Sequence, residues 1–359
     1  MKIKSNRFFL KIGFLILSLS LISADSRLSK LSISNLLKIG YDSNVSRISE
    51  TESLDFNNSS FMSLKSSVNS SFKLLKRKTR INFSIKMNYY LNVEEKSNYA
   101  YYFNIIQPIG NYQSIKYNYS FINDIYIRKY DDLDYLIHDE IYNGTDCFFD
   151  LIKYKISYES PYIGAKDKFE LSIFNELQYY SPEFTEYDLS IVGGELKIFT
   201  KQKTNKYNIS LGFVQADTLY SHAHQLLIED LDEGLTLRLV DRSYTERSVK
   251  ISYDFPVNEN VVGFSLSKKE RKYLSESVFP MEINDDVYFI SDDLHKDRKH
   301  QDYQIGAWYT FDNGNNKNKI LFSYRKRITS SPHKWVENLK SFSKYNIEYN
   351  IYFNKIKLK

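Results

Sequence analysis

Charged side chains recur at alternate positions in several segments of the sequence, and their spacing suits the passage of ions. An extended chain would gather them on one face, because successive side chains of a strand point to opposite sides. The set comprises Arg80, Lys86, Lys116, Lys153, Lys155, Glu170, Glu176, Glu195, Lys197, Asp254, Arg325, Arg327 and Glu348. Two interpretations stay open: a ladder of salt bridges that keeps a wet interior neutral, or the charged walls of a selective channel.

Residues suited to metal binding or catalysis are fewer. His222 and His224 would share one face of an extended segment, but two His without a placed third ligand make only a weak metal site. The acidic run 229–233 lacks the spacing of a calcium-binding loop. Cys147 is the only cysteine, so an internal disulfide is excluded and a buried or wall-facing thiol is expected. We therefore expect no enzymatic activity and no cofactor.

The elements that must position the charged residues are β-strands. Between 80 and 92, apolar residues such as Ile81 and Phe83 alternate with polar ones such as Asn82 and Ser84. This period of two lasts longer than in a soluble strand and fits a strand tilted across a bilayer. Fourteen segments carry the pattern: 33–41, 62–74, 81–91, 99–105, 117–127, 152–158, 169–179, 189–198, 207–213, 249–255, 262–266, 303–311, 320–324 and 345–353.

The connections between these segments alternate between long and short, as expected for a barrel with both ends on the periplasmic side. Within 189–198 the apolar parity changes across Gly193 and Gly194, which predicts a β-bulge there. The long connection 217–246 contains a hairpin pattern around 231–234. Its arms are too short to cross a membrane, so we predict an extracellular extension, with a barrel of 16 strands as the alternative.

The composition agrees with a wall that has one apolar face and one wet face. The chain holds 31 Tyr and 24 Phe, yet its mean hydropathy is −0.47. A secreted β-sandwich or β-helix would also alternate, but it would bury an aliphatic face. Here Tyr and Phe gather near the ends of the segments, as the aromatic girdles of a membrane barrel require. The predicted fold is all-β: a transmembrane antiparallel β-barrel of about 14 strands.

The first 24 residues differ from the rest, with four basic residues before an apolar run of about 11 residues. We predict a signal peptide at 1–24 and an outer-membrane barrel at 25–359. Removing the leader leaves 45 basic and 44 acidic residues, a net charge of +1. That near balance, without a basic stripe, excludes nucleic acid as a partner.

The opening segment Ile39-Gly40-Tyr41-Asp42-Ser43-Asn44-Val45 resembles the first strand of a broad class of outer-membrane barrels, among them the C-terminal 14-stranded barrel of the surface lipoprotein assembly modifier family. The likeness extends loosely to 296–303 and 345–353. It implies an export-associated barrel. These modifiers carry a helical tetratricopeptide domain before the barrel, and only a few residues separate the predicted leader from the first strand here.

The expected function is a channel or transport barrel for small solutes, because about 14 strands enclose more space than side chains alone fill. The connection 216–246 or 268–300 would fold in as a constriction. A surface-binding protein that acts through its long loops is the alternative, and export of a partner is a third possibility. Expected partners are outer-membrane lipid, lipopolysaccharide and the barrel assembly machinery, the last through Tyr349, Ile351 and Phe353 near the C-terminal end.

Overall fold

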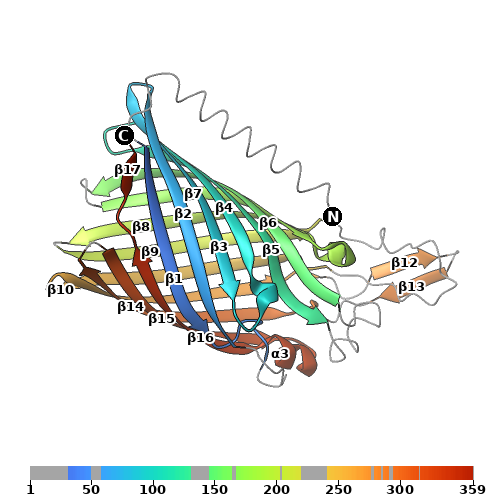
Figure 1. Cartoon of the computed structure of the whole chain (residues 1–359). Coiled ribbons are helices and arrows are strands. Elements are labelled where there is room, and N and C mark those ends of the chain that lie inside the picture. The colour runs from blue at the N-terminus through green and yellow to red at the C-terminus, as the bar shows by residue number, and fades with distance from the viewer. Residues whose placement is uncertain are drawn as a thin grey trace.

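Fourteen antiparallel strands join edge to edge into a closed barrel (Figure 1). The computed structural model describes residues 31–49, 58–130, 145–163, 167–202, 204–219, 241–275, 279–283, 286–290, 294–314 and 316–358. The barrel strands are β1 (Leu31–Asp42), β2 (Ser59–Leu74), β3 (Arg77–Tyr90), β4 (Asn98–Pro108), β5 (Ser114–Tyr130), β6 (Thr145–Ile163), β7 (Asp167–Tyr180), β8 (Leu189–Gln202), β9 (Asn205–Thr218), β10 (Tyr244–Val257), β11 (Asn260–Tyr273), β14 (Lys299–Asn313), β15 (Asn316–Ser330) and β16 (Phe342–Tyr352). The predicted count of 14 is confirmed, and the alternative of 16 is wrong.

The seam between the first and last strands closes the barrel in two pieces. Strand β1 pairs with β16 from Leu36↔Tyr352 to Asp42↔Asn346. Beyond that stretch a short strand, β17 (Ile356–Leu358), pairs with the beginning of β1, from Leu31↔Leu358 onward. Residues 356–358, which follow Phe353, thus complete the closure.

Deleting residues 354–359 is expected to weaken this seam without opening the barrel. The deletion removes three register pairs while the β1–β16 pairing remains. At about 1 kcal/mol net per backbone hydrogen bond, we expect a loss of roughly 1 to 3 kcal/mol. Urea unfolding in lipid vesicles measures it, with Lys355→Ala as the control that leaves the pairing intact. An unchanged unfolding midpoint in the deletion variant would contradict this role of β17.

The two faces of the barrel wall differ in chemistry. Outward side chains are large and apolar, and Ile173, Val192 and Leu266 leave 64%, 57% and 56% of their surface exposed. Inward positions between them carry small or charged residues, such as the buried Ser84 and Ser157. A soluble sandwich would instead bury its large aliphatic residues between sheets. A closed antiparallel barrel that is apolar outside and polar inside is a protein of the outer membrane.

The connections separate the two ends of the barrel. The short ones lie at 75–76, 109–113, 164–166, 203–204, 258–259 and 314–315. The long ones, at the opposite end, are 43–58, 91–97, 131–144, 181–188, 219–243, 274–298 and 331–341. Long connections mark the extracellular side of outer-membrane barrels.

The long connections contain the remaining described elements. These are the 3-10 helices η1 (Glu94–Lys96) and η3 (Pro182–Tyr187), the helix α3 (Lys334–Lys340) and a hairpin of β12 (Phe279–Ile283) and β13 (Asp286–Ile290). The hairpin projects beyond the barrel wall at the end where α3 lies (Figure 1). Among the described residues no helix has the length and apolarity needed to span a membrane.

The predicted bulge at Gly193 and Gly194 is wrong, because β8 keeps an unbroken register with both neighbours. The apolar parity changes for another reason: Leu189 and Ile191 face inward, where they pack in a buried cluster with Tyr244. The part of the inner wall formed by this cluster is thus apolar instead of polar. The hairpin pattern around 231–234, His222, His224 and the acidic run 229–233 lie outside the described residues.

A bulge does occur in β5, where the register with β6 shifts between Ile122 and Ile125. Asp124 has a φ of 51°, a left-handed conformation that Asp tolerates better than most residues. Beyond the extra residue, the positions whose side chains point inward and outward are exchanged. As a result Ile125 lines the interior at the outer end of the barrel.

Candidate functional site

The thirteen charged residues singled out in the sequence stand on inward positions of their strands. Lys153 and Lys155, for example, alternate with Tyr154 and Ile156, which are exposed on the outer surface. Seven of the thirteen lie together on β5 to β8: Lys116, Lys153, Lys155, Glu170, Glu176, Glu195 and Lys197. The structure therefore brings about half of the set together on one wall and distributes the rest around the barrel.

That wall is a network of ion pairs. Lys116 Nζ lies 2.6 Å from both Glu159 Oε2 and Glu170 Oε2, and Lys155 Nζ lies 2.7 Å from Glu195 Oε2. The pairs Lys153–Glu176 and Lys197–Glu195, each at 3.0 Å, extend it. Because each charge has an opposite partner nearby, this wall has the form of the neutral salt-bridge ladder.

The remaining predicted residues divide into paired and unpaired ones. Glu348 accepts from Lys38 at 3.2 Å, and Asp254 accepts a 2.8 Å hydrogen bond from the Trp308 indole. The Trp308 ring lies directly over Gly263, where any Cβ would collide with it. On β3, Arg80 and Lys86 have no ion-pair partner among the residues that the structure describes. Arg325 and Arg327 belong to a separate cluster at the outer end.

This outer end contains a cavity of about 640 Å³ with a strong excess of positive charge. Among the described residues, ten basic and three acidic side chains line it, a formal net charge of +7. The basic residues are Arg47, Lys96, Arg242, Lys269, Arg271, Arg298, Arg325, Arg327, Lys340 and Lys344, and the acidic ones are Asp42, Glu246 and Asp302.

The cavity lies at the extracellular mouth, beyond the apolar band of the barrel. Strand β11 shows this, because its outward positions change from Phe264 and Leu266 to the charged Lys268, Glu270 and Lys272. The strand therefore extends past the lipid into water, and its inward residues at that level line the cavity.

The three carboxylates hold the basic groups in place. Asp302 accepts from Arg325 and Arg327, both with Nη2 distances of 2.8 Å. Glu246 accepts from Arg271 at 2.8 Å, with Lys269 at 3.6 Å. Two basic side chains share each of these carboxylates, so the local charge is fixed in position but not neutralised.

Asp42 supports the same arrangement from the end of β1. It accepts from Lys344 on β16 at 2.7 Å. This ion pair ties the barrel seam to the wall of the cavity.

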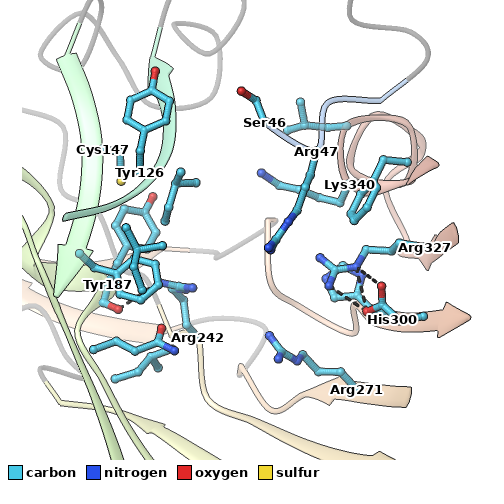
Figure 2. A pocket seen from close by; sticks show the side chains of 18 of the residues that line it. Ser46, Arg47, Tyr126, Cys147, Tyr187, Arg242, Arg271, His300, Arg327 and Lys340 are labelled. Atoms are coloured by element: carbon cyan, nitrogen blue, oxygen red, sulfur yellow. Dashed lines mark hydrogen bonds and ion pairs between the residues drawn. The ribbon is translucent and has the colours of Figure 1, made fainter. Parts of the chain in front are cut away.

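The connection after β1 places Arg47 inside the mouth of the barrel. Asn44 fixes this turn: its amide donates to the carbonyls of Ile48 at 2.7 Å and Ser343 at 3.1 Å, and its oxygen accepts from the Ile48 amide at 2.9 Å. Arg47 has a φ of 58°, an uncommon conformation for a residue with a Cβ. Figure 2 shows its side chain extending between Arg242 on one side and Arg271 and Arg327 on the other.

The wall formed by β6, β7 and η3 is aromatic. Cys147, Tyr180, Phe184 and Tyr187 form a buried cluster, so the lone thiol is buried as expected. Arg242 donates to the Tyr187 carbonyl at 3.0 Å, and its guanidinium stacks over both tyrosine rings of the cluster at 5.0 and 5.2 Å from their centres. Such cation–π contacts hold a guanidinium without neutralising it.

The crowding of like charges affects the groups in the connections. Burial and the nearby charges of Arg47 and Lys344 lower the pKa of Lys96 to about 7. Burial and the charges of Arg325 and Arg327 lower the pKa of Arg47 to about 10, so this guanidinium stays protonated at neutral pH. An anion inside the cavity would relieve both effects.

Arg325 and Arg327 were predicted from the sequence, whereas the other charged residues of this site were not. Arg47, Arg242 and Arg298 lie outside the strands, where no periodicity points to them. Arg271 and Asp302 were detectable by continuing the strand alternation beyond the apolar residues. One of the two connections 216–246 and 268–300 was expected to fold in as a constriction. The cavity lining includes Arg242 from the first and Leu294, His295 and Arg298 from the second, whereas the β12–β13 hairpin of the second projects beyond the barrel wall. Among the described residues no cluster of three potential metal ligands occurs.

Comparisons with known proteins give only remote structural likenesses. The sequence matches no protein-family model and no curated protein. An anion-selective porin from Comamonas acidovorans has a similar structure, with a TM-score of 0.43 and 6% identity over 92% of this chain and 99% of that one. The outer-membrane channel DcaP of Acinetobacter baumannii has a TM-score of 0.45 and 8% identity over 92% of this chain and 98% of that one. At such scores we draw no functional argument from the likeness.

Proposed function

We propose that the protein is an outer-membrane channel that conducts anions in preference to cations. The observation that supports this is the formal net charge of +7 that the described residues place around the cavity at the extracellular mouth. A solute entering from outside meets this charge first, and a charged, low-dielectric mouth raises the local concentration of the opposite sign. The neutral ladder on β5 to β8 imposes no comparable preference further in.

The reversal potential of the purified protein in planar bilayers tests the proposal. Under a gradient of potassium chloride, we expect discrete conductance steps and a potential whose sign reports chloride as the more permeant ion. Chloride and potassium have nearly equal mobility in water, so the sign reflects the protein. An absence of conductance, or a preference for potassium, would contradict the proposal.

The selectivity is expected to depend on pH through Lys96. A lysine is charged below its pKa, and that of Lys96 is about 7, so the cavity loses one positive charge as the pH rises from 6 to 8. The ratio of chloride to potassium permeability should fall roughly twofold over this interval, as one charge at several ångströms in water allows. In the Lys96→Met variant the ratio should fall clearly less across the same range. An identical decrease in both proteins would assign the titration to another group.

Two other functions have some support in the sequence. A surface-binding protein would act through its long connections, and deleting them should abolish binding while conductance persists. The resemblance of 39–45 to the barrel of the surface lipoprotein assembly modifier family favours an export-associated barrel instead. The channel is preferred because the charge excess lies inside the barrel mouth, where a solute would pass.

The proposed partners follow from the location in the outer membrane. Lipid and lipopolysaccharide would surround the apolar band and its extracellular edge. We retain Tyr349, Ile351 and Phe353 as the proposed signal for the barrel assembly machinery. Tyr349 and Ile351 are on the closing strand β16, and Phe353 directly follows it, with its amide donating to the Asn35 carbonyl at 3.1 Å. No catalytic role is proposed.

A further inference from the structure

The two sides of the cavity differ in chemistry as well as in position. On the side of β5 and β6, Ile125 follows the bulge in β5, and Cys147 and Phe149 lie on the paired strand β6. All three residues line the cavity. On the facing side, β11, β14 and β15 contribute Arg271, Asp302 and Arg327. Figure 2 shows Cys147 and Tyr187 on one side of the space and Arg271, His300 and Arg327 on the other.

The cationic side retains hydrogen-bond donors that no described residue uses. Asp302 accepts from Nε and Nη2 of both Arg325 and Arg327, so Nη1 of each remains for another acceptor. Arg47, which extends into the space, makes no ion pair or side-chain hydrogen bond with any residue in the described ranges. A carboxylate is the acceptor whose planar geometry matches these planar donors.

Lys96 also lies on the side of β5, 3.2 Å from the Ile127 carbonyl, but the apolar side chains of this side have no use in conducting simple inorganic ions. A hydrated ion gains nothing from Ile125 or Phe149, which would only remove water from it. Those side chains do favour the apolar body of an organic molecule, and about 640 Å³ is a usual size for a site that binds one. A ligand with a ring at one end and a carboxylate at the other would contact both sides at once.

We propose that the cavity is a binding site for small organic anions that carry an apolar ring, with monocyclic aromatic carboxylates as the substrate class. The ring lies against Ile125 and Phe149, and the carboxylate accepts from Arg47 and from the arginines held by Asp302. This inference rests on the proposed anion channel for the passage of the substrate, but binding itself is measured separately from conductance.

Equilibrium dialysis of the protein in lipid nanodiscs, with empty nanodiscs as the blank, tests the proposal with three probes. Benzoate carries ring and charge, acetate carries the charge alone, and benzyl alcohol carries the ring alone. We expect saturable binding of benzoate at least tenfold tighter than that of either other probe. Equal affinities for benzoate and acetate would overturn the role of the apolar side. Absence of saturable benzoate binding would overturn the site.

Substitutions on each side of the cavity test the role of that side in binding. Arg47→Gln should weaken benzoate binding at least fivefold, whereas Arg80→Gln, the same change at an unpaired arginine on β3, should leave it unaltered. Phe149→Ser should bring the benzoate affinity down towards that of acetate, and Ile125→Ser does the same with less disturbance of packing. Equal losses in Arg47→Gln and Arg80→Gln would overturn the assignment. Benzoate binding in a pore without anion preference would count against the proposed function alone.

Discussion

Replacing Arg47 by Glu is expected to remove most of the preference for anions. The substitution changes the charge by two units at a position inside the mouth, between basic groups on either side. One charge about 4 Å from a passing ion is worth about 1 kcal/mol in bulk water, and salt at 0.1 M screens part of this. We therefore expect the ratio of chloride to potassium permeability to fall roughly tenfold, as measured from reversal potentials.

Arg80→Glu is the matched control for this experiment. It makes the same change of charge on an inward position of β3, near the short turns at the opposite end of the barrel. Its effect on selectivity should be clearly smaller, because the net charge of the outer cavity is unchanged. If both variants changed the ratio equally, selectivity would depend on the charge of the whole lumen, and the cavity would lose its special role. Arg47→Gln should give an intermediate ratio.

Asp302→Ala is expected to be the most destabilising single substitution in the cavity wall. The carboxylate is 9% exposed and holds the guanidinium groups of Arg325 and Arg327, which would otherwise repel each other. Removing one partner of a buried ionic group leaves the others uncompensated and typically costs about 3 to 5 kcal/mol. The cavity admits water, so we expect a value near 3 kcal/mol, measured by urea unfolding of the protein in lipid vesicles.

The control for this substitution is Glu270→Ala on the outside of β11. Glu270 pairs with Lys268 at 2.5 Å, but both side chains are about half exposed to water. Exposed pairs contribute little to stability, so the unfolding midpoint should not change measurably. A loss of stability in Asp302→Ala no larger than in Glu270→Ala would mean that the carboxylate does not hold the two arginines together.

The strands were predictable because lipid imposes a strict rule on the outer face. Outward residues within the bilayer are mostly apolar, so a period of two recurs from one crossing to the next. The segment 262–266 shows where this signal ends: β11 continues to Tyr273, but its outward residues from Lys268 onward are charged. The backbone keeps pairing in water, where the apolar pattern is no longer required. The apolar pattern therefore underestimated how far strands such as β11 extend on the extracellular side.

The cavity was harder to predict for the same reason. Arg271 lies in the extension of β11 that the apolar pattern does not reach, and Arg47 and Arg242 lie in connections. The position of Arg47 depends on the turn fixed by Asn44, and that of Arg242 on stacking over Tyr187. Neither interaction produces a periodic pattern in the sequence. Leu189 and Ile191 caused a different error. They are apolar residues on the inner surface, and the resulting change of apolar parity was interpreted as a bulge.

The seam that joins β1 to β16 has a consequence for biogenesis. Neighbouring barrel strands elsewhere are consecutive in the sheet order, apart from the inserted β12–β13 hairpin, whereas Lys38 and Glu348 at the seam are 310 residues apart. Hairpins can form locally and early, but the seam must wait until the far end of the polypeptide arrives. Until then both terminal strands have unsatisfied backbone groups, which hydrocarbon does not tolerate. We therefore expect an insertion intermediate to need a chaperoning surface that covers two edges at once.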